Sequence, residues 1–234
     1  MPLRDQVIIV TGAAGNLGAA VVAELARREA RVVCVDASRR RLVALEKAAG
    51  AQLLLLDGPD LTWLDGAGKM AAATLERFSR IDSLVNTIGG FRMAPVGPDA
   101  LKDGDFLMDV NGRAALATTA AVLPPMAVRK YGRIVHIAAG AGQRGGPGLA
   151  VYAAAKAAVM RITESLAVEH RAHGIVANCI LPGTIDTPQN RAAMPDADAN
   201  AWVMPANIAS VIALLVSKEA GAITGAAIPV TQRV

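Results

Sequence analysis

The sequence of 234 residues predicts an α/β fold, with a single doubly wound parallel sheet of about seven strands and helices on both faces. Short apolar runs alternate with longer amphipathic segments along the whole chain, as in consecutive β-α-β units. A glycine-containing turn follows the first apolar run, and an aspartate ends the second. The length suits one domain, so we expect residues 1–234 to form a single folded unit.

The apolar runs locate the elements in order. They predict strands near residues 7–11, 31–35, 52–56, 83–87, 133–138, 175–181 and 226–230. Amphipathic segments fill most of the intervals, and the long helices are expected near 16–29, 104–129 and 150–172. An irregular stretch at about 185–205 follows the sixth strand, where open α/β sheets bind their ligands, so we expect it to be a substrate loop.

The composition argues against several classes of protein. Hydrophobic residues make up 53% of the chain and aromatic residues only 3%, so aliphatic side chains must build the core. The mean hydropathy is +0.37, yet no apolar run approaches the ~18 residues of a membrane-spanning helix. The first apolar run is too short for a signal peptide, which predicts a cytoplasmic location. Cys34 and Cys179 provide neither a disulfide framework nor metal-ligand spacing, so no metal is expected.

The basic character of the chain does not indicate a nucleic-acid partner. The formal charge is +4 and the pI is near 9.4, but Lys and Arg residues are dispersed apart from a cluster at 38–42. Few aromatic residues are interleaved with them, which disfavours nucleic-acid binding. The cluster suits a solvated helix start or the lining of a site for an anion.

The first candidate site is the turn after the first strand. Gly12, Gly15 and Gly18 follow Thr11 at intervals of three before a predicted helix. Glycine permits a tight turn and close backbone approach, so the N–H groups of the helix can face a pyrophosphate. An ordinary strand-turn-helix shows a similar pattern, so this turn alone does not identify a binding site. The residue that ends the second strand favours the binding site over that alternative.

Asp36 ends that second strand, at the spacing expected for a carboxylate that binds the adenosine ribose of a dinucleotide. A carboxylate accepts hydrogen bonds from ribose hydroxyls and repels a 2′-phosphate, which favours NAD(H) as the cofactor. The nearby Arg39 and Arg40 keep NADP(H) open, because a guanidinium pairs with phosphate.

Tyr152 and Lys156 form the second candidate site. They lie four residues apart in the predicted helix 150–172 and therefore on one face of it. A nearby cation favours phenolate, so we expect Lys156 to lower the pKa of Tyr152. Tyr152 is thereby a candidate proton donor or acceptor.

This pair resembles the Tyr-x-x-x-Lys signature of the short-chain dehydrogenase/reductase family, and further motifs match in order along the chain. The resemblance implies a Rossmann-type fold, oxidoreductase activity, a nicotinamide cofactor and a proton relay completed by Asn111. The implied cofactor-binding residues are Thr11, Gly12, Gly15, Asn16, Leu17, Gly18, Asp36, Asp57, Asn86, Gly89, Tyr152, Lys156, Pro182, Gly183 and Thr184 or Thr187.

Two of these positions leave room for another interpretation. Many members have glycine where this chain has Asn16, so we interpret the turn as a variant with the same phosphate role. Asp57 corresponds to the acid that contacts adenine, and a solvated strand end is the alternative.

The chain departs from the family at Ala139, where most members have serine. In members that reduce ketones, the serine and tyrosine hydroxyls together bind the carbonyl oxygen, and removing one such donor costs about 2.7–4 kcal/mol. The acceptor is therefore not a ketone, or another side chain substitutes, or catalysis is lost. Gln143, Arg144 and His136 are the candidates for substitution, although His136 also suits a buried core position.

The segment 181–202 resembles the quinonoid dihydropteridine reductases, members of this family that also carry alanine at that position. The match comprises Asp186, Thr187, Pro188, Asn190, Arg191, Met194, Pro195, Ala197, Asp198 and Trp202. It implies hydride transfer from C4 of NADH to a conjugated, imine-like ring, with Tyr152 as proton donor and Lys156 on the nicotinamide ribose. Phe91, Gln143 and Trp202 are the expected substrate contacts.

Two other functions remain open. The chain is alternatively a carbonyl or 3-oxoacyl-thioester reductase of the 3-oxoacyl-ACP type with a substituted serine, or a sensor that binds NAD(H) without turnover. The retained Tyr152, Lys156 and Asn111 favour an enzyme. By resemblance we expect a small-molecule substrate, no membrane partner, and a homodimer or homotetramer that pairs through helices 104–129 and 150–172.

Overall fold

The computed structural model describes residues 2–49 and 53–231. A seven-stranded sheet forms its centre, in the order β3-β2-β1-β4-β5-β6-β7. The strands are β1 (Val7–Thr11), β2 (Arg31–Asp36), β3 (Leu53–Asp57), β4 (Ser83–Asn86), β5 (Gly132–Ile137), β6 (Ile175–Pro182) and β7 (Ala227–Val230). Every neighbouring pair in the sheet runs parallel, which confirms the predicted doubly wound sheet.

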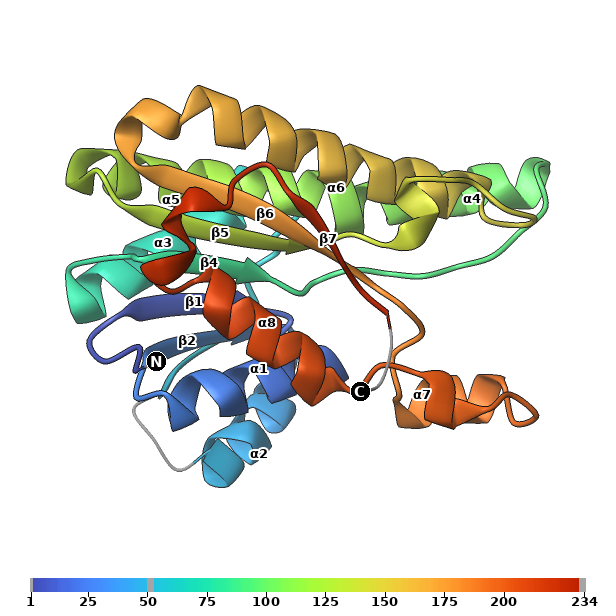
Figure 1. Cartoon of the computed structure of the whole chain (residues 1–234), viewed down its shortest axis with the longest axis horizontal. Coiled ribbons are helices and arrows are strands. Elements are labelled where there is room, and N and C mark those ends of the chain that lie inside the picture. The colour runs from blue at the N-terminus through green and yellow to red at the C-terminus, as the bar shows by residue number, and fades with distance from the viewer. Residues whose placement is uncertain (1, 50–52, 232–234) are drawn as a thin grey trace.

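Helices cover both faces of the sheet (Figure 1). They are α1 (Asn16–Arg27), α2 (Arg39–Ala49), α3 (Leu64–Phe78), α4 (Pro98–Leu107), α5 (Ala114–Arg129), α6 (Ala150–Glu169), α7 (Pro188–Ala193) and α8 (Pro205–Leu215). Ile8 and Val10 pack in one core with α1 and α8, whereas Val7 and Ile9 pack in another with α3, α5 and α6. Because successive strand residues face opposite sides, the central strands must be apolar throughout, as the sequence shows.

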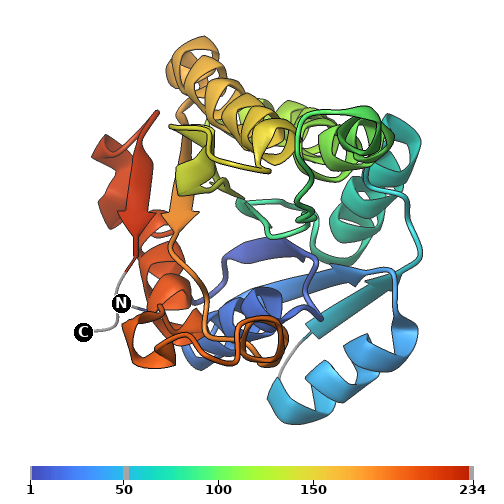
Figure 2. The same ribbon diagram turned by 90° about the vertical axis from the view of Figure 1, so that its right-hand side faces the viewer.

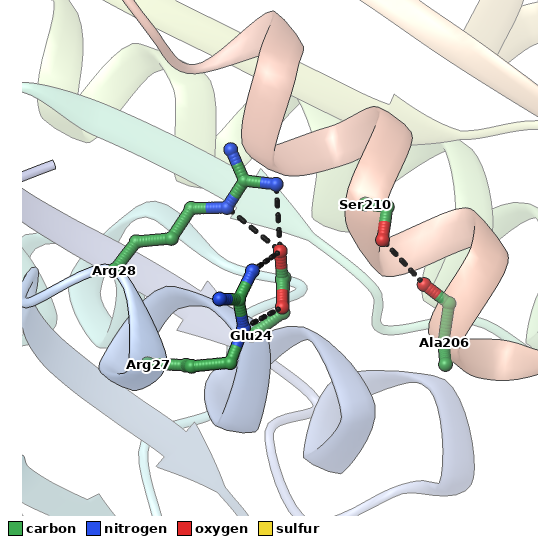
Figure 3. Close-up of polar contacts among 5 residues, drawn as sticks. All are labelled: Glu24, Arg27, Arg28, Ala206 and Ser210. Carbon is green, nitrogen blue, oxygen red and sulfur yellow. Dashed lines mark hydrogen bonds and ion pairs between the residues drawn. The ribbon is translucent and has the colours of Figure 1, made fainter. Parts of the chain in front are cut away.

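Helices α1 and α8 lie side by side on one face (Figure 3). Glu24 accepts hydrogen bonds from Arg27 and Arg28, so the charged groups at this end of α1 are paired on α1 itself. The hydroxyl of Ser210 donates to the carbonyl of Ala206 within α8. The contact between the two helices is therefore left to apolar side chains of the first core.

The predicted helix 104–129 is wrong in its detail, because the structure divides it. Helix α4 ends at Leu107, a π-helical turn, η1, spans Met108–Arg113, and α5 begins at Ala114. Apolar periodicity does not distinguish a single π turn from continuous α-helix, since the wide turn inserts only a small phase change.

The remaining element boundaries differ from prediction by a few residues. Helix α1 ends at Arg27, and Glu29 has a positive φ of 65°. Helix α6 ends at Glu169, before a 3-10 turn at Arg171–His173. The strand predicted at 52–56 is observed at Leu53–Asp57, and position 52 lies outside the described residues.

All seven strands end at the same edge of the sheet because they run parallel. Figure 2 faces this carboxyl edge, where α7 lies beside the beginning of α1. In the part of the chain that the structure describes, no helix is both long and apolar enough to cross a membrane. Because all the strands end at this carboxyl edge, the loops that follow them bring the site residues predicted from the sequence together there.

Candidate active site at the carboxyl edge of the sheet

The turn between β1 and α1 has the shape of an anion cradle. Gly12 has φ +64°, and a Cβ added there would lie 3.0 Å from the Ile88 nitrogen. A Cβ on Gly18 would lie 2.2 Å from the Gly12 oxygen, so no other residue fits this close approach. Helix α1 begins at Asn16 after Gly15, and no side chain caps it. The N–H groups of its first turn are therefore available to a phosphate, which fits a dinucleotide.

The ends of β1 and β4 are held together where the strand order reverses. Thr11 Oγ1 donates a hydrogen bond to Asn86 Oδ1, and Thr87 Oγ1 donates to the Thr11 carbonyl at 2.6 Å. Open α/β sheets bind their ligands at this topological switch point. The structure thus brings Thr11 and Asn86 together beside the turn.

Asp36 is fixed at the end of β2. Its carboxylate accepts hydrogen bonds from the backbone nitrogens of Ala14 and Ser38, both at 3.1 Å, and from Arg41 at 3.0 Å. Its side chain is only 7% exposed. The cation beside Asp36 is therefore Arg41. It is not Arg39 or Arg40, the two arginines that the sequence suggested.

Asp57 lies at the end of β3, where Arg39 contacts it at 3.0 Å. Both side chains are largely exposed, so this pair contributes little to stability. A cavity of about 860 Å³ adjoins Asp57 on the side of β3 and α3, and its wall includes Trp63 and Met70. The lining of this cavity contains no residue of the Tyr152 site, so it is not the place of the chemistry.

Tyr152 and Lys156 lie together on α6. Lys156 Nζ donates to the Ile137 carbonyl at 2.8 Å and lies 5.9 Å from the centre of the Tyr152 ring. Burial lowers the pKa of Lys156 to about 8 and raises the pKa of Tyr152 to about 12. The expectation that Lys156 lowers the pKa of Tyr152 is wrong for this structure, because the cost of burying phenolate outweighs the cation at this distance.

The π-helical turn η1 positions Asn111. The Asn111 side chain is buried, and its Nδ2 donates to the carbonyls of Leu107 at 2.9 Å and Gly90 at 3.1 Å. A Cβ on Gly89 would lie 2.9 Å from Asn111 Oδ1 and 3.4 Å from Lys156 Nζ. Glycine at position 89 therefore lets the Asn111 amide and the Lys156 ammonium approach the same point.

Two of the expected substrate residues, Phe91 and Trp202, differ in how exposed they are. The Phe91 ring is 59% exposed and meets the Tyr152 ring edge to face, with centroids 4.9 Å apart. Trp202 is only 7% exposed, and its contact with substrate stays a prediction. Burial of this large apolar ring favours the folded state.

Ala139 follows β5 and leads into a 3-10 turn, η2 (Gly140–Gly142), that rests against α6. A Cβ on Gly142 would lie 2.8 Å from the backbone carbon of Lys156, so this turn approaches the helix closely. Gln143 follows the turn with an exposed side chain, and Arg144 is also exposed. Both of these candidates for replacing the missing serine hydroxyl, Gln143 and Arg144, are therefore exposed to solvent.

The segment after β6 leads into α7, which contacts the beginning of α1. A Cβ on Gly183 would lie 2.6 Å from the Thr231 carbonyl, which explains a glycine after Pro182. Thr184 is exposed, whereas Thr187 is buried and its hydroxyl oxygen accepts from the Asn190 nitrogen at 3.1 Å as the cap of α7. The capping bond explains the Thr-Pro start of the helix.

Asn16 and Leu17 have different partners at the start of α1. The Asn16 side chain donates to Gln189 of α7 at 2.7 Å, so it joins the two helices. Leu17 packs against the first core. At Asn16 and Leu17, only the backbone N–H groups therefore remain to bind a phosphate.

His136 occupies a core position on β5. It is fully buried, its Nε2 lies 3.3 Å from Thr119 Oγ1, and burial together with the Lys156 charge lowers its pKa to about 4. Cys34 and Cys179 are buried free thiols. Within the described residues, His, Cys, Asp and Glu side chains form no group of three that would hold a metal ion.

Two features of the site were not predicted. The Ile137 carbonyl that fixes Lys156 is a backbone group, and no side-chain pattern identifies it. Arg41 belongs to the cluster at 38–42, but the helix turn that carries it toward Asp36 depends on the packing of α2.

Comparison with known proteins agrees with this geometry. The family model described as short chain dehydrogenase matches residues 6–198. The chain is 31% identical over 235 residues to the 3-oxoacyl-[acyl-carrier-protein] reductase of Thermotoga maritima, covering 96% of each. It is 34% identical over 187 residues to dehydrogenase/reductase SDR family member 6 of Rattus norvegicus, covering 80% of this chain and 74% of that protein.

Solved structures have the same fold. Levodione reductase matches with a TM-score of 0.90 and 28% identity, over 97% of this chain and 96% of that one. NAD⁺-bound xylitol dehydrogenase matches with a TM-score of 0.90 and 25% identity, over 98% and 99%. The chain belongs to the short-chain dehydrogenase/reductase family.

Proposed function

We propose that this oxidoreductase transfers hydride from NADH to a conjugated, imine-like acceptor such as a quinonoid dihydropteridine. The observation that carries the proposal is that Tyr152 is present while Ala139 stands in the place of serine, so these two positions supply one hydroxyl and not two. Negative charge that develops on a ketone oxygen is localised, so losing one of two donors costs about 10²–10³ in kcat. Charge on an imine-like ring spreads over the heterocycle, so one donor suffices.

The protonation state of Tyr152 supports reduction. Burial raises the pKa of Tyr152 to about 12, so the phenol carries its proton at neutral pH. Reduction of an imine-like ring consumes one proton, which a neutral phenol can donate. The buried Lys156 ammonium, held by the Ile137 carbonyl, lies close enough to stabilise the phenolate that this donation leaves.

Phe91 supports a flat acceptor. Its exposed ring packs edge to face on Tyr152, so one ring face remains open to a second planar group. A heterocycle stacked there would lie near Tyr152, which contacts the same ring. Phe91 is then a wall of the acceptor site.

The residues present fit a dinucleotide. The first turn of α1 would bind the pyrophosphate, the Asp36 carboxylate the adenosine ribose, and Lys156 the nicotinamide ribose. When bound, NADH supplies the hydride. Asp36 favours NADH over NADPH, because a carboxylate fixed by backbone N–H groups repels a 2′-phosphate.

Steady-state oxidation of NADH with quinonoid dihydropteridine tests the proposal. We expect turnover with the wild-type protein and a loss of about 10²–10⁴-fold in kcat for Tyr152→Phe, which removes the proton donor and keeps the ring. Absence of turnover with any pterin would refute the pterin assignment. Turnover unchanged in Tyr152→Phe would refute the role of Tyr152.

A second candidate is a 3-oxoacyl-thioester reductase. It is favoured by the 31% identity, over 96% of each chain, to the 3-oxoacyl-[acyl-carrier-protein] reductase of Thermotoga maritima. The (2S)-[(R)-hydroxy(phenyl)methyl]succinyl-CoA dehydrogenase subunit of Thauera aromatica is also 31% identical, over 96% of this chain. A higher kcat/KM for a 3-oxoacyl thioester than for the pterin would favour this candidate.

The proposed organisation is one domain over residues 1–234, with a substrate loop at about 185–205 that carries α7. We expect the chain to pair as a homodimer or homotetramer. Leu116 and Val128 on α5 and Val168 on α6 are exposed apolar side chains that such pairing would cover.

A further inference from the structure

The segment between β6 and α8 folds back on itself as a flap, residues 184–203, which carries α7. Its two ends are joined by backbone hydrogen bonds, from the Val203 nitrogen to the Thr184 carbonyl and from the Asp186 nitrogen to the Val203 carbonyl, both at 2.9 Å. Trp202 and Val203 are buried. The base of the flap is therefore fixed to the body of the protein.

Beyond its base, the flap is held mainly to itself. Arg191 donates two hydrogen bonds to Asp186, at 2.6 and 2.9 Å, and the Asn190 side chain donates to the Ile185 carbonyl at 2.8 Å. None of the six residues of α7 is buried, and residues 192–198 are exposed. Moving α7 as a unit therefore costs little apolar burial, so a single polar contact has a measurable effect on its position.

One such contact joins α7 to the beginning of α1 (Figure 2). The Nδ2 of Asn16, the first residue of α1, donates to the Oε1 of Gln189 at 2.7 Å. This hydrogen bond connects the turn after β1 with the flap after β6, and β4 and β5 lie between those two strands in the sheet. The connection therefore spans the carboxyl ends of β4 and β5, beside the switch point where open α/β sheets bind their ligands.

The two side chains of this contact are not required for the fold. Asn16 and Gln189 are both exposed, so neither contributes to a core. No side chain caps α1, and the cap of α7 is Thr187. The contact therefore acts on where the flap lies and not on whether the chain folds.

We infer that the Asn16–Gln189 hydrogen bond is a latch, which holds the flap across the dinucleotide site and slows both entry and release of the cofactor. The inference rests on the proposed use of the carboxyl edge for a dinucleotide. At Asn16 only the backbone N–H is directed to a phosphate, so its side chain can hold Gln189 with or without the cofactor. A contact that is equally strong in both states changes the two rate constants by one factor, and their ratio, Kd, stays the same.

Stopped-flow fluorescence of NADH tests the latch. Association is followed at increasing NADH concentration, and dissociation is followed after a chase with excess NAD⁺. Gln189→Ala should raise both rate constants by about three- to tenfold, the range expected for one hydrogen bond, and leave Kd unchanged. Asn16→Ala should do the same. The double variant should be no faster than either single variant, because each substitution removes the same bond.

A matched variant separates the latch from a general effect on the flap. Asn200→Ala removes an exposed amide side chain from the tip of the flap and leaves the latch intact, so it should keep wild-type rates. Unchanged rates in Gln189→Ala, or additive effects in the double variant, would overturn the inference. A higher Kd caused by faster dissociation alone would also overturn it, because that result indicates direct contact with the cofactor. Wild-type protein that binds neither NADH nor NADPH would refute the cofactor assignment as well as the latch.

Discussion

Burial acts on Tyr152 and Lys156 in opposite directions, because it penalises phenolate in one and ammonium in the other. The pKa of Tyr152 rises to about 12, and that of Lys156 falls to about 8. At neutral pH the phenol is therefore neutral, and the ammonium retains most of its charge. The pair combines a proton donor with a cation that would attract a ribose hydroxyl and the phenolate formed after donation.

The lowered pKa of Lys156 predicts a pH limit on catalysis. We expect kcat/KM for NADH, which reports ionisations of the free enzyme, to fall as the pH rises through about 8. Lys156 loses its charge in that range. Lys156→Arg should be slower but should show no such fall up to about pH 10, because a guanidinium stays charged. An identical alkaline fall in both proteins would show that another group is responsible.

Ala139 predicts a change of substrate class. Serine at this position would add the second donor for a ketone oxygen, and one such donor is worth about 10²–10³ in kcat. We expect Ala139→Ser to raise kcat/KM for simple ketones by about tenfold or more while changing pterin turnover little. Ala141→Ser, in the same turn, is the matched control and should raise neither rate. Equal gains in the two variants would contradict a specific role for position 139.

At the scale of elements, the sequence predicted the sheet well because parallel strands buried on both faces form continuous apolar runs. Val7 to Val10 is such a run, divided in the structure between two cores. The π turn η1 was missed because local periodicity barely changes across it. The sequence also predicted that the site residues lie at the ends of strands, and therefore at one edge of the sheet. Burial of Trp202 and the direction of the Tyr152 pKa shift depend on tertiary packing, which no short motif encodes.

His136 predicts an acid sensitivity of the packing between β5 and α5. Its pKa of about 4 in the folded protein lies below the reference value of 6.5, so protonation favours unfolding. The stabilising contribution is complete above about pH 6.5 and is lost as the pH falls toward 4, by about 3 kcal/mol in total. Urea unfolding of the wild type and of His136→Asn across this pH range measures the loss of stability.

The variant should lose much of that acid dependence. His173→Asn changes an exposed histidine and should retain the wild-type dependence. If His136→Asn and wild type lose stability equally between pH 6.5 and 4, the acid sensitivity has another origin.

For the whole molecule, the two edges of the sheet differ in what they expose. The carboxyl edge presents helix N–H groups, the Asp36 carboxylate and the Tyr152 site, whereas the amino edge presents Arg129 and Lys218 around a cavity. Parallel strands enforce this separation, since every βα loop lies at one edge and every αβ loop at the other. A cofactor at the carboxyl edge binds only the folded chain, so it should stabilise the whole sheet.

Cofactor choice is therefore measurable as thermal stability. NADH at a hundredfold excess over its Kd should add about 2.7 kcal/mol, which for a chain of this size raises Tm by roughly 5–10 °C. NADPH at the same concentration should raise it less, because the backbone nitrogens of Ala14 and Ser38 fix the Asp36 carboxylate where the 2′-phosphate would lie. Asp36→Asn should narrow the difference, whereas Asp57→Asn should lower both shifts together. A larger shift with NADPH than with NADH in the wild-type protein would reverse the assignment of the cofactor.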